Sequence, residues 1–223
     1  MATAMPDQTL LSEVELFRDL GPAALAKVTA SADVRDLQRG DVVFEQDDEA
    51  DELFVVRDGR IAVANKSDDG RESLIALMER GDLFGEMPLF DGLPRSAEAR
   101  SLEPSSILAI PYEILRQIFG EEPGHLWHVV RLLATRLRVT DEALADSVFL
   151  DVTGRTAKRL LELAGEDDEF SLPITQEELA GMVGASRERV NKAIASFIRL
   201  GWIEQVDRQY TITNRDQLTI RAR

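Results

Sequence analysis

Residues 175–200, TQEELAGMVGASRERVNKAIASFIRL, carry the strongest structural signal in this sequence. Thr175 followed three residues later by Glu178 is a capping-box pattern, which predicts the start of a helix. Gly184 is typical of a helix end, and Ser186 predicts the start of a second helix directly after it. Two helices joined by so tight a turn are typical of a helix-turn-helix.

The second predicted helix has two chemically different faces. Val190, Ile194 and Phe197 recur at helical spacing, which predicts the side that packs on the domain core. The polar side begins at the helix N-terminus, where a helix-turn-helix enters the major groove of double-stranded DNA. We expect base contacts from Arg187, Glu188, Asn191 and Lys192, and phosphate contacts from Thr175, Ser186 and Arg189. A solvated face of mixed charge is the alternative interpretation.

The charge distribution agrees with a DNA-binding C-terminal region, although the chain has a net charge of −15. Residues 1–148 contain 15 basic and 29 acidic side chains, a net of −14, whereas residues 149–223 contain 11 and 12. From Phe170 onward the balance is 8 basic to 6 acidic. Salt screens remote charge over about 8–10 Å, so the acidic N-terminal part does not forbid phosphate binding elsewhere. Alternating apolar residues behind the helices predict a small β-wing: Ile203, Val206, Tyr210 and Ile212.

The N-terminal half has a different pattern. From Leu11 to about Ala30 the apolar spacing predicts one helix. From Val34 to Ile110 short apolar runs alternate with glycines, which predicts a small β-roll. Asp58-Gly59 and Asp69-Gly70 predict hairpin turns, because glycine adopts positive φ without a steric penalty.

A long helix is predicted from about Pro123 to Val148. Apolar residues recur along it at alternating spacings of three and four, typical of a helix paired lengthwise with another: Leu126, Val130, Leu133, Leu137 and Leu144. Thr140 is the one polar member of this series. A second apolar face is predicted from Trp127, Leu132 and Val139. We therefore expect this helix to contact both the β-roll and a second copy of the chain, whereas a helix buried in one domain is the alternative.

Composition excludes several classes of site. The chain has no cysteine, so disulfides, cysteine-ligated iron–sulfur clusters and thiolate zinc sites are excluded. Its two histidines are His125 and His128, and we expect no metal site, no catalytic residues and no catalytic cofactor. No apolar run reaches the roughly 18 residues of a membrane span, and the N-terminus does not read as a signal peptide. A cytoplasmic protein without a membrane partner is expected.

Three motifs follow one another in the order and spacing of a known family. They are Phe84-Gly-Glu86 with Arg95-Ser-Ala97, Phe149-Leu-Asp-Val-Thr-Gly-Arg155, and Val183-Gly-Ala-Ser-Arg-Glu188. On these motifs the chain resembles the cAMP receptor protein/FNR family of bacterial regulators, from about Phe17 to Ile212. The resemblance implies an α+β fold. Its expected parts are a cyclic-nucleotide-binding β-roll (1–120), a dimerisation helix with a hinge (121–150) and a winged helix-turn-helix (151–223).

The resemblance also implies a cAMP site in the roll. Glu86 would accept a hydrogen bond from the ribose 2′-hydroxyl, and Arg95 would pair with the cyclic phosphate. Ser96 and the backbone near Gly85 and Ala97 would complete the phosphate contacts. An arginine–phosphate pair is charge-assisted and directional, which suits a shielded site.

The same resemblance assigns Thr140 and the hinge, whereas Asp141 stands where the family often has Ser or Asn. Thr140 would contact the amino group of adenine, unless its hydroxyl bonds a carbonyl of its own helix. Asp141 can accept from an amino group and cannot donate to a carbonyl, which favours adenine over guanine. Phe149, Leu150 and Asp151 would form the hinge between the ligand-binding and DNA-binding parts.

Together these inferences predict a transcription regulator rather than an enzyme. As a homodimer it would bind palindromic TGTGA-like sites under allosteric control by cAMP, with RNA polymerase as a further partner. Two alternatives stay open: the same regulator responding to another small molecule, or one active without ligand. A haem-based sensor would have to use His125 or His128.

Overall fold

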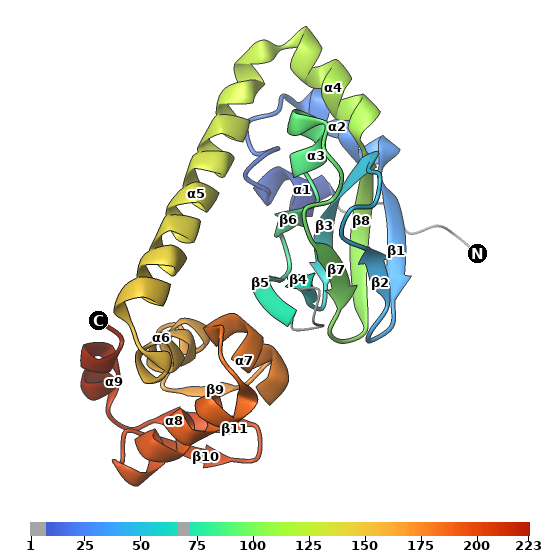
Figure 1. The fold of residues 1–223 in the computed structure, drawn as a ribbon. Coiled ribbons are helices and arrows are strands. Elements are labelled where there is room, and N and C mark those ends of the chain that lie inside the picture. The colour runs from blue at the N-terminus through green and yellow to red at the C-terminus, as the bar shows by residue number, and fades with distance from the viewer. Residues whose placement is uncertain (1–7, 67–71) are drawn as a thin grey trace. The chain divides into compact units, whose positions relative to one another are not determined.

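The computed structural model describes residues 8–66 and 72–223, and its contacts divide the chain into two compact units (Figure 1). The first unit runs to Leu137 and the second from Arg138 to Arg223. The boundary falls within one helix, α5 (Leu126–Phe149). The first unit combines sheets and helices, and so does the second, which confirms the predicted α+β class.

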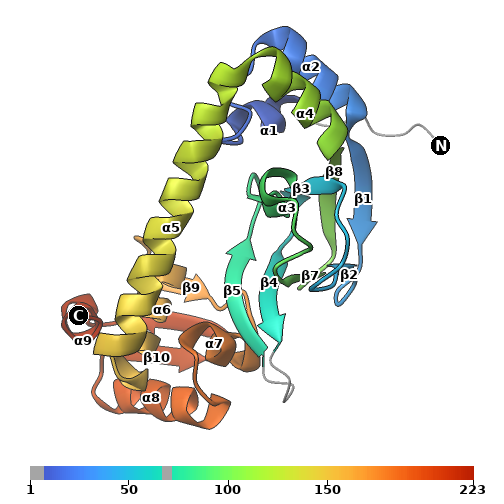
Figure 2. The ribbon, with the colours of Figure 1, turned by 45° about the horizontal axis from the view of Figure 1, so that its top comes forward.

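Two four-stranded antiparallel sheets form the first unit, as predicted for a β-roll (Figure 2). One sheet has the order β1-β8-β3-β6 and the other β2-β7-β4-β5. The strands are β1 (Asp33–Leu37), β2 (Val42–Phe44), β3 (Glu52–Asp58), β4 (Ile61–Lys66), β5 (Glu72–Met78), β6 (Leu83–Phe84), β7 (Glu98–Ser101) and β8 (Ser105–Pro111).

Strand β3 shows how one sheet is buried on both faces. Phe54 and Val56 belong to the core cluster that joins the two sheets, whereas Leu53 and Val55 belong to the cluster beneath the helices. This division follows from the strand period of two, which points successive side chains to opposite faces. Each buried side chain of this size stabilises the fold by about 1.5–3 kcal/mol relative to exposure.

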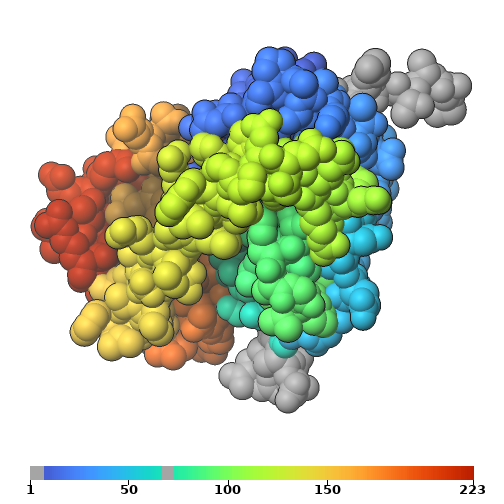
Figure 3. All heavy atoms as spheres, turned by 90° about the horizontal axis from the view of Figure 1, so that it is seen from above, coloured from blue at the N-terminus to red at the C-terminus, as the bar shows by residue number. Residues whose placement is uncertain are grey.

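The helices of the first unit correct one prediction. The helical segment expected from Leu11 to Ala30 is two helices: the first ends at Glu13, and the second starts at Pro22, whose missing N–H costs no hydrogen bond at the first position of a helix. In the space-filling view, α2, α4 and the start of α5 cover one end of this unit (Figure 3). The elements are α1 (Gln8–Glu13), α2 (Pro22–Ser31), α3 (Met87–Asp91), α4 (Tyr112–Glu121) and a 3₁₀ turn (Pro123–His125).

The predicted hairpin at Asp58-Gly59 is also wrong. The two strands that it joins, β3 and β4, belong to different sheets, so the turn is a corner between the sheets. Glycine is required there: φ of Gly59 is +80°, and a Cβ would lie 2.3 Å from the Ser105 hydroxyl. Strands β4 and β5 do pair antiparallel, but the turn at Asp69-Gly70 lies outside the described residues.

Helix α5 confirms the predicted long helix and corrects its second face. Val129 and Leu132 are buried, whereas Trp127 is 71% exposed and Val139 61% exposed. With 3.6 residues per turn, Trp127 and Leu132 lie about 140° apart and could not share a face. The predicted seam residues are all at least 38% exposed: Leu126, Val130, Leu133, Leu137 and Leu144.

The second unit contains the predicted helix-turn-helix and wing. A three-stranded antiparallel sheet of order β10-β11-β9 packs with the helices. None of the helices in the described parts of the chain is long and apolar enough to cross a bilayer. The elements are α6 (Val152–Ala164), β9 (Glu169–Ser171), α7 (Gln176–Val183), α8 (Arg187–Arg199), β10 (Ile203–Val206), β11 (Gln209–Ile212) and α9 (Arg215–Arg221).

Candidate ligand site and nucleic-acid interface

Arg95 lies buried in the roll, only 3% exposed. Its Nη1 donates to the Gly85 carbonyl at 2.7 Å and to the Tyr112 hydroxyl at 3.1 Å. Its Nη2 donates to the Glu52 carbonyl at 2.8 Å, and the Phe44 ring centroid lies 4.1 Å from the guanidinium carbon. Nε of Arg95 has no hydrogen-bond partner among the described residues.

The surroundings of Arg95 are built to hold this cation. Burial lowers the pKa of Arg95, and hydrogen bonds and an aromatic face compensate for the lost water. Burial raises the pKa of Tyr112 to about 12, so its hydroxyl stays protonated and donates to the Gly85 carbonyl. Gly85 has φ +76°, and a Cβ there would lie 2.6 Å from Nη1 of Arg95. Only glycine therefore fits this turn.

Glu86 is the second buried charge of the site, 1% exposed. Its Oε1 accepts from Arg136 of α5, whose other terminal nitrogen donates to the Leu83 carbonyl. Arg136 was not among the predicted site residues. It lies four residues before Thr140, one helical turn away on the same face, and this spacing could have identified it.

The two buried charges each keep one unused polar atom. Nε of Arg95 is a donor and Oε2 of Glu86 is an acceptor, and neither has a partner among the described residues. Buried polar atoms of native proteins rarely stay unpaired, so such a pair calls for an explanation. A ligand with an anionic oxygen for Arg95 and a hydroxyl for Glu86 would satisfy both.

The other residues predicted to contact the ligand differ in burial and in the unit to which they belong. Ala97 is buried, and Ser96 is exposed with its hydroxyl 3.7 Å from the Met87 sulfur. Thr140 and Asp141 belong to the second unit, where both are exposed on α5. Their part in the ligand site therefore stays a prediction.

Both helices of the helix-turn-helix begin at the predicted capping residues. Thr175 Oγ1 accepts from the Glu178 amide at 3.2 Å, while the Glu178 carboxylate accepts from the Thr175 amide at 2.6 Å. Gly184 ends α7 at φ +67°, and the Ser186 hydroxyl caps α8 by accepting from the Arg189 amide. These local bonds fix the tight turn that presents α8.

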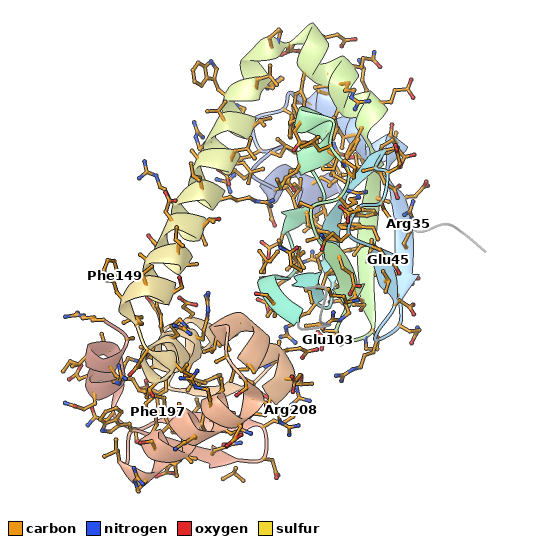
Figure 4. All side chains as sticks on the ribbon, viewed as in Figure 1. Arg35, Glu45, Glu103, Phe149, Phe197 and Arg208 are labelled. Atoms are coloured by element: carbon orange, nitrogen blue, oxygen red, sulfur yellow. The ribbon has the colours of Figure 1, made fainter. Side chains whose placement is uncertain are left out.

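Helix α8 buries one face and exposes the other. Its core side includes Phe197, which Figure 4 labels in the second unit, together with Val190, Ala193 and Ile194. The residues of α8 that are predicted to contact bases or phosphates are all exposed, and no side chain among them has a hydrogen bond or ion pair recorded within residues 8–66 and 72–223: Arg187, Glu188, Arg189, Asn191 and Lys192. This face can bind a partner without breaking internal contacts.

The predicted hinge falls at the break between α5 and α6. Phe149 ends α5 with 82% of its surface exposed, and Leu150 is buried (Figure 4). Asp151 caps α6 by accepting from the Gly154 amide at 2.8 Å. Arg155 donates to the Leu150 carbonyl at 2.7 Å and also to the last carbonyl of α7. The hinge backbone is therefore connected to the helix-turn-helix.

Comparison with known proteins places both units in described families. Residues 34–122 match the cyclic nucleotide-binding domain, and residues 154–220 match the Crp-like helix-turn-helix domain. A "CRP-like cAMP-activated global transcriptional regulator" of Mycobacterium tuberculosis is 36% identical over 221 residues, which is 96% of this chain and 99% of that protein.

Two further relatives agree with these matches. The "cAMP-activated global transcriptional regulator CRP" of Salmonella typhimurium is 35% identical over 159 residues, 68% of this chain and 76% of the relative. The structure of "The c-di-GMP Responsive Global Regulator CLP" of Xanthomonas campestris has a TM-score of 0.75 at 25% identity. It covers 86% of this chain and 99% of that one.

Proposed function

Because this chain belongs to the cAMP receptor protein/FNR family of transcription regulators, we propose that it is a cytoplasmic homodimer whose DNA binding is controlled by cAMP. Ligand binding in the roll would change the hinge at residues 149–151 and with it the placement of the reading helices. A coupling of about 1–3 kcal/mol between the sites would suffice for such control. RNA polymerase is the further partner.

The observation that carries the ligand proposal is the pair of unused atoms on Arg95 and Glu86. The cyclic phosphate of cAMP offers anionic oxygens to Arg95, and its ribose offers a hydroxyl to Glu86. Thr140 would bond the adenine amino group, and Asp141 would favour adenine over guanine. A charged acceptor that meets the carbonyl of guanine would be left unpaired, which costs binding free energy.

The dimer proposal rests on α5. Its exposed apolar residues follow a heptad spacing over five turns, and burying them against a second copy would remove a long apolar stripe from water. The proposed DNA target follows from two-fold symmetry. A symmetric dimer presents two copies of α8 to half-sites one helical turn apart, and we propose palindromic TGTGA-like sequences.

The alternative is a regulator that responds to a different small molecule in place of cAMP, and one observation favours it. The relative of Xanthomonas campestris is described as responsive to c-di-GMP, so this fold accommodates other cyclic nucleotides. A haem-based sensor would have to use His125 or His128, and each uses one ring nitrogen for an acidic partner. Nε2 of His125 lies 3.1 Å from a carboxylate oxygen of Glu122, and Nδ1 of His128 lies 3.2 Å from a carboxylate oxygen of Asp19.

Calorimetry with cAMP, cGMP and c-di-GMP tests the ligand, and DNA binding with and without it tests the control. The variant Glu86→Ala, Arg95→Ala should lose nucleotide binding, and its DNA affinity should no longer respond to cAMP. Circular dichroism should show the parent's secondary structure. A variant that responds to cAMP as the parent does would contradict the assigned pocket.

A further inference from the structure

The C-terminal helix α9 is held along α6 by its first residues. Nε of Arg215 donates to Asp168 at 2.9 Å, and its Nη atoms donate to the carbonyls of Gly165 and Asp167 at 2.9 and 2.6 Å. Leu218, in the middle of α9, is completely buried. These contacts attach α9 to the C-terminal end of α6 without help from the last turn of α9.

Arg221, in that last turn, contacts the opposite end of α6. Its Nη2 pairs with both carboxylate oxygens of Asp151, the N-cap of α6. The approach is close: a Cβ on Gly154 would lie 3.0 Å from Nη1 of Arg221 and 3.1 Å from its carbonyl oxygen. The glycine therefore leaves room for Arg221 to reach the carboxylate.

A cavity of about 540 Å³ opens beside this ion pair, between the first residues of α6 and one side of α8. Three cations and two carboxylates line it, and two of the cations belong to the predicted DNA-binding face. The lining residues with charge are Arg189, Lys192, Arg199, Asp151 and Glu188.

The carboxylate of Asp151 opposes phosphate binding at this cavity. A phosphate that approaches Arg189 or Lys192 from solvent comes within the screening length of Asp151, about 8–10 Å at cellular salt. An unpaired carboxylate would therefore cancel part of the attraction. Asp151 serves as the capping acceptor of α6, and Arg221 pairs with the charge that this carboxylate brings.

We propose that Arg221 supports DNA binding indirectly: by pairing with Asp151 it neutralises that carboxylate and so keeps the cavity between α6 and α8 cationic toward DNA phosphates. This inference rests on the proposed DNA-binding function. Arg221 acts through Asp151, so its own contact with DNA is not required.

The test measures duplex affinity of the full chain with cAMP present, by fluorescence anisotropy, on a palindromic TGTGA site and on an unrelated duplex. Arg221→Ala should weaken binding to both about two- to fivefold at low salt, and less at high salt, as expected for a change of peripheral charge. The double variant Asp151→Asn, Arg221→Ala should regain the parent's affinity, because asparagine caps a helix as well as aspartate but carries no charge.

Arg223→Ala is the matched control, since Arg223 carries the same charge two residues away and no ion pair is recorded for it in the described part of the chain. The affinity of Arg223→Ala for both duplexes should stay near that of the parent. A double variant as weak as Arg221→Ala, an Arg221→Ala variant equal to the parent, or an equal loss in Arg223→Ala would each overturn the proposal. A parent that binds neither duplex would instead contradict the proposed function.

Discussion

The ligand site and the reading helix both depend on arginines, but the two regions hold them in opposite ways. Arg95 is 3% exposed and makes three hydrogen bonds inside the roll. Arg187 is exposed and has no partner recorded within residues 8–66 and 72–223. Charge in the roll is therefore part of what stabilises the fold, whereas charge on α8 is added to a fold that does not need it. Substitutions on α8 should therefore change DNA binding without changing stability. Substitutions of the buried charges in the roll should change both ligand binding and stability.

The largest expected effect is on the roll. Arg136→Ala leaves the buried carboxylate of Glu86 without its cation, and we expect a loss of about 2–3 kcal/mol of unfolding free energy. Chemical denaturation measures this loss. Adding Glu86→Gln should restore part of it, because the neutral amide tolerates burial better than an unpaired charge. A single variant as stable as the parent would show that the roll does not depend on this pair.

The next effect is on DNA binding alone. Arg187→Ala should cost about 1–3 kcal/mol of affinity for the preferred site and relax the base preference, with no change in thermal stability. Arg189→Ala, which removes an expected phosphate contact, should weaken all sequences equally. Competition binding with single-base variants of the site distinguishes the two. A fall in melting temperature for Arg187→Ala would remove the contrast with the roll.

The smallest effect concerns the acid stability of the second unit. Hydrogen bonding from the Gly154 amide and pairing with Arg221 lower the pKa of Asp151. The stability gained is present above the unfolded pKa of about 3.9 and is lost as the pH falls through the lower folded value. The Asp151 side chain is 64% exposed, so the gain is at most about 0.2–1 kcal/mol. Thermal melts from pH 7 to pH 3 should be flatter for Asp151→Asn, and parallel curves would contradict the ion pair.

The same contrast explains what the sequence could predict. Both helices of the helix-turn-helix were predicted because capping residues act locally, within four residues of Thr175 or Ser186. Exposure of the reading residues follows from helical periodicity once Val190 is assigned to the core. Neither inference required knowledge of a distant contact.

The contacts within the roll are harder to predict from the sequence, because they join residues that lie far apart in the chain. Arg136 meets Glu86 across 50 positions, so its spacing from Thr140 could mark the residue but not its partner. Asp58-Gly59 has the sequence of a hairpin, yet its strands pair with β8 and β7 instead. Likewise, the apolar character of Trp127 suggests a buried face, but its angle around the helix places it about 140° from the buried Leu132.

Strand β8 has a consequence for how the chain folds during synthesis. It is the last strand of the roll to be made, yet it lies between β1 and β3, with Ala109 opposite both Asp33 and Phe54. Strands β1 and β3 therefore leave the ribosome without their shared neighbour, because 67 residues separate the end of β1 from β8 and 46 residues separate the end of β3 from it. Non-local pairing of this kind slows folding and leaves strand edges open to aggregation. The β-roll is thus the part of the chain that should gain most from a chaperone.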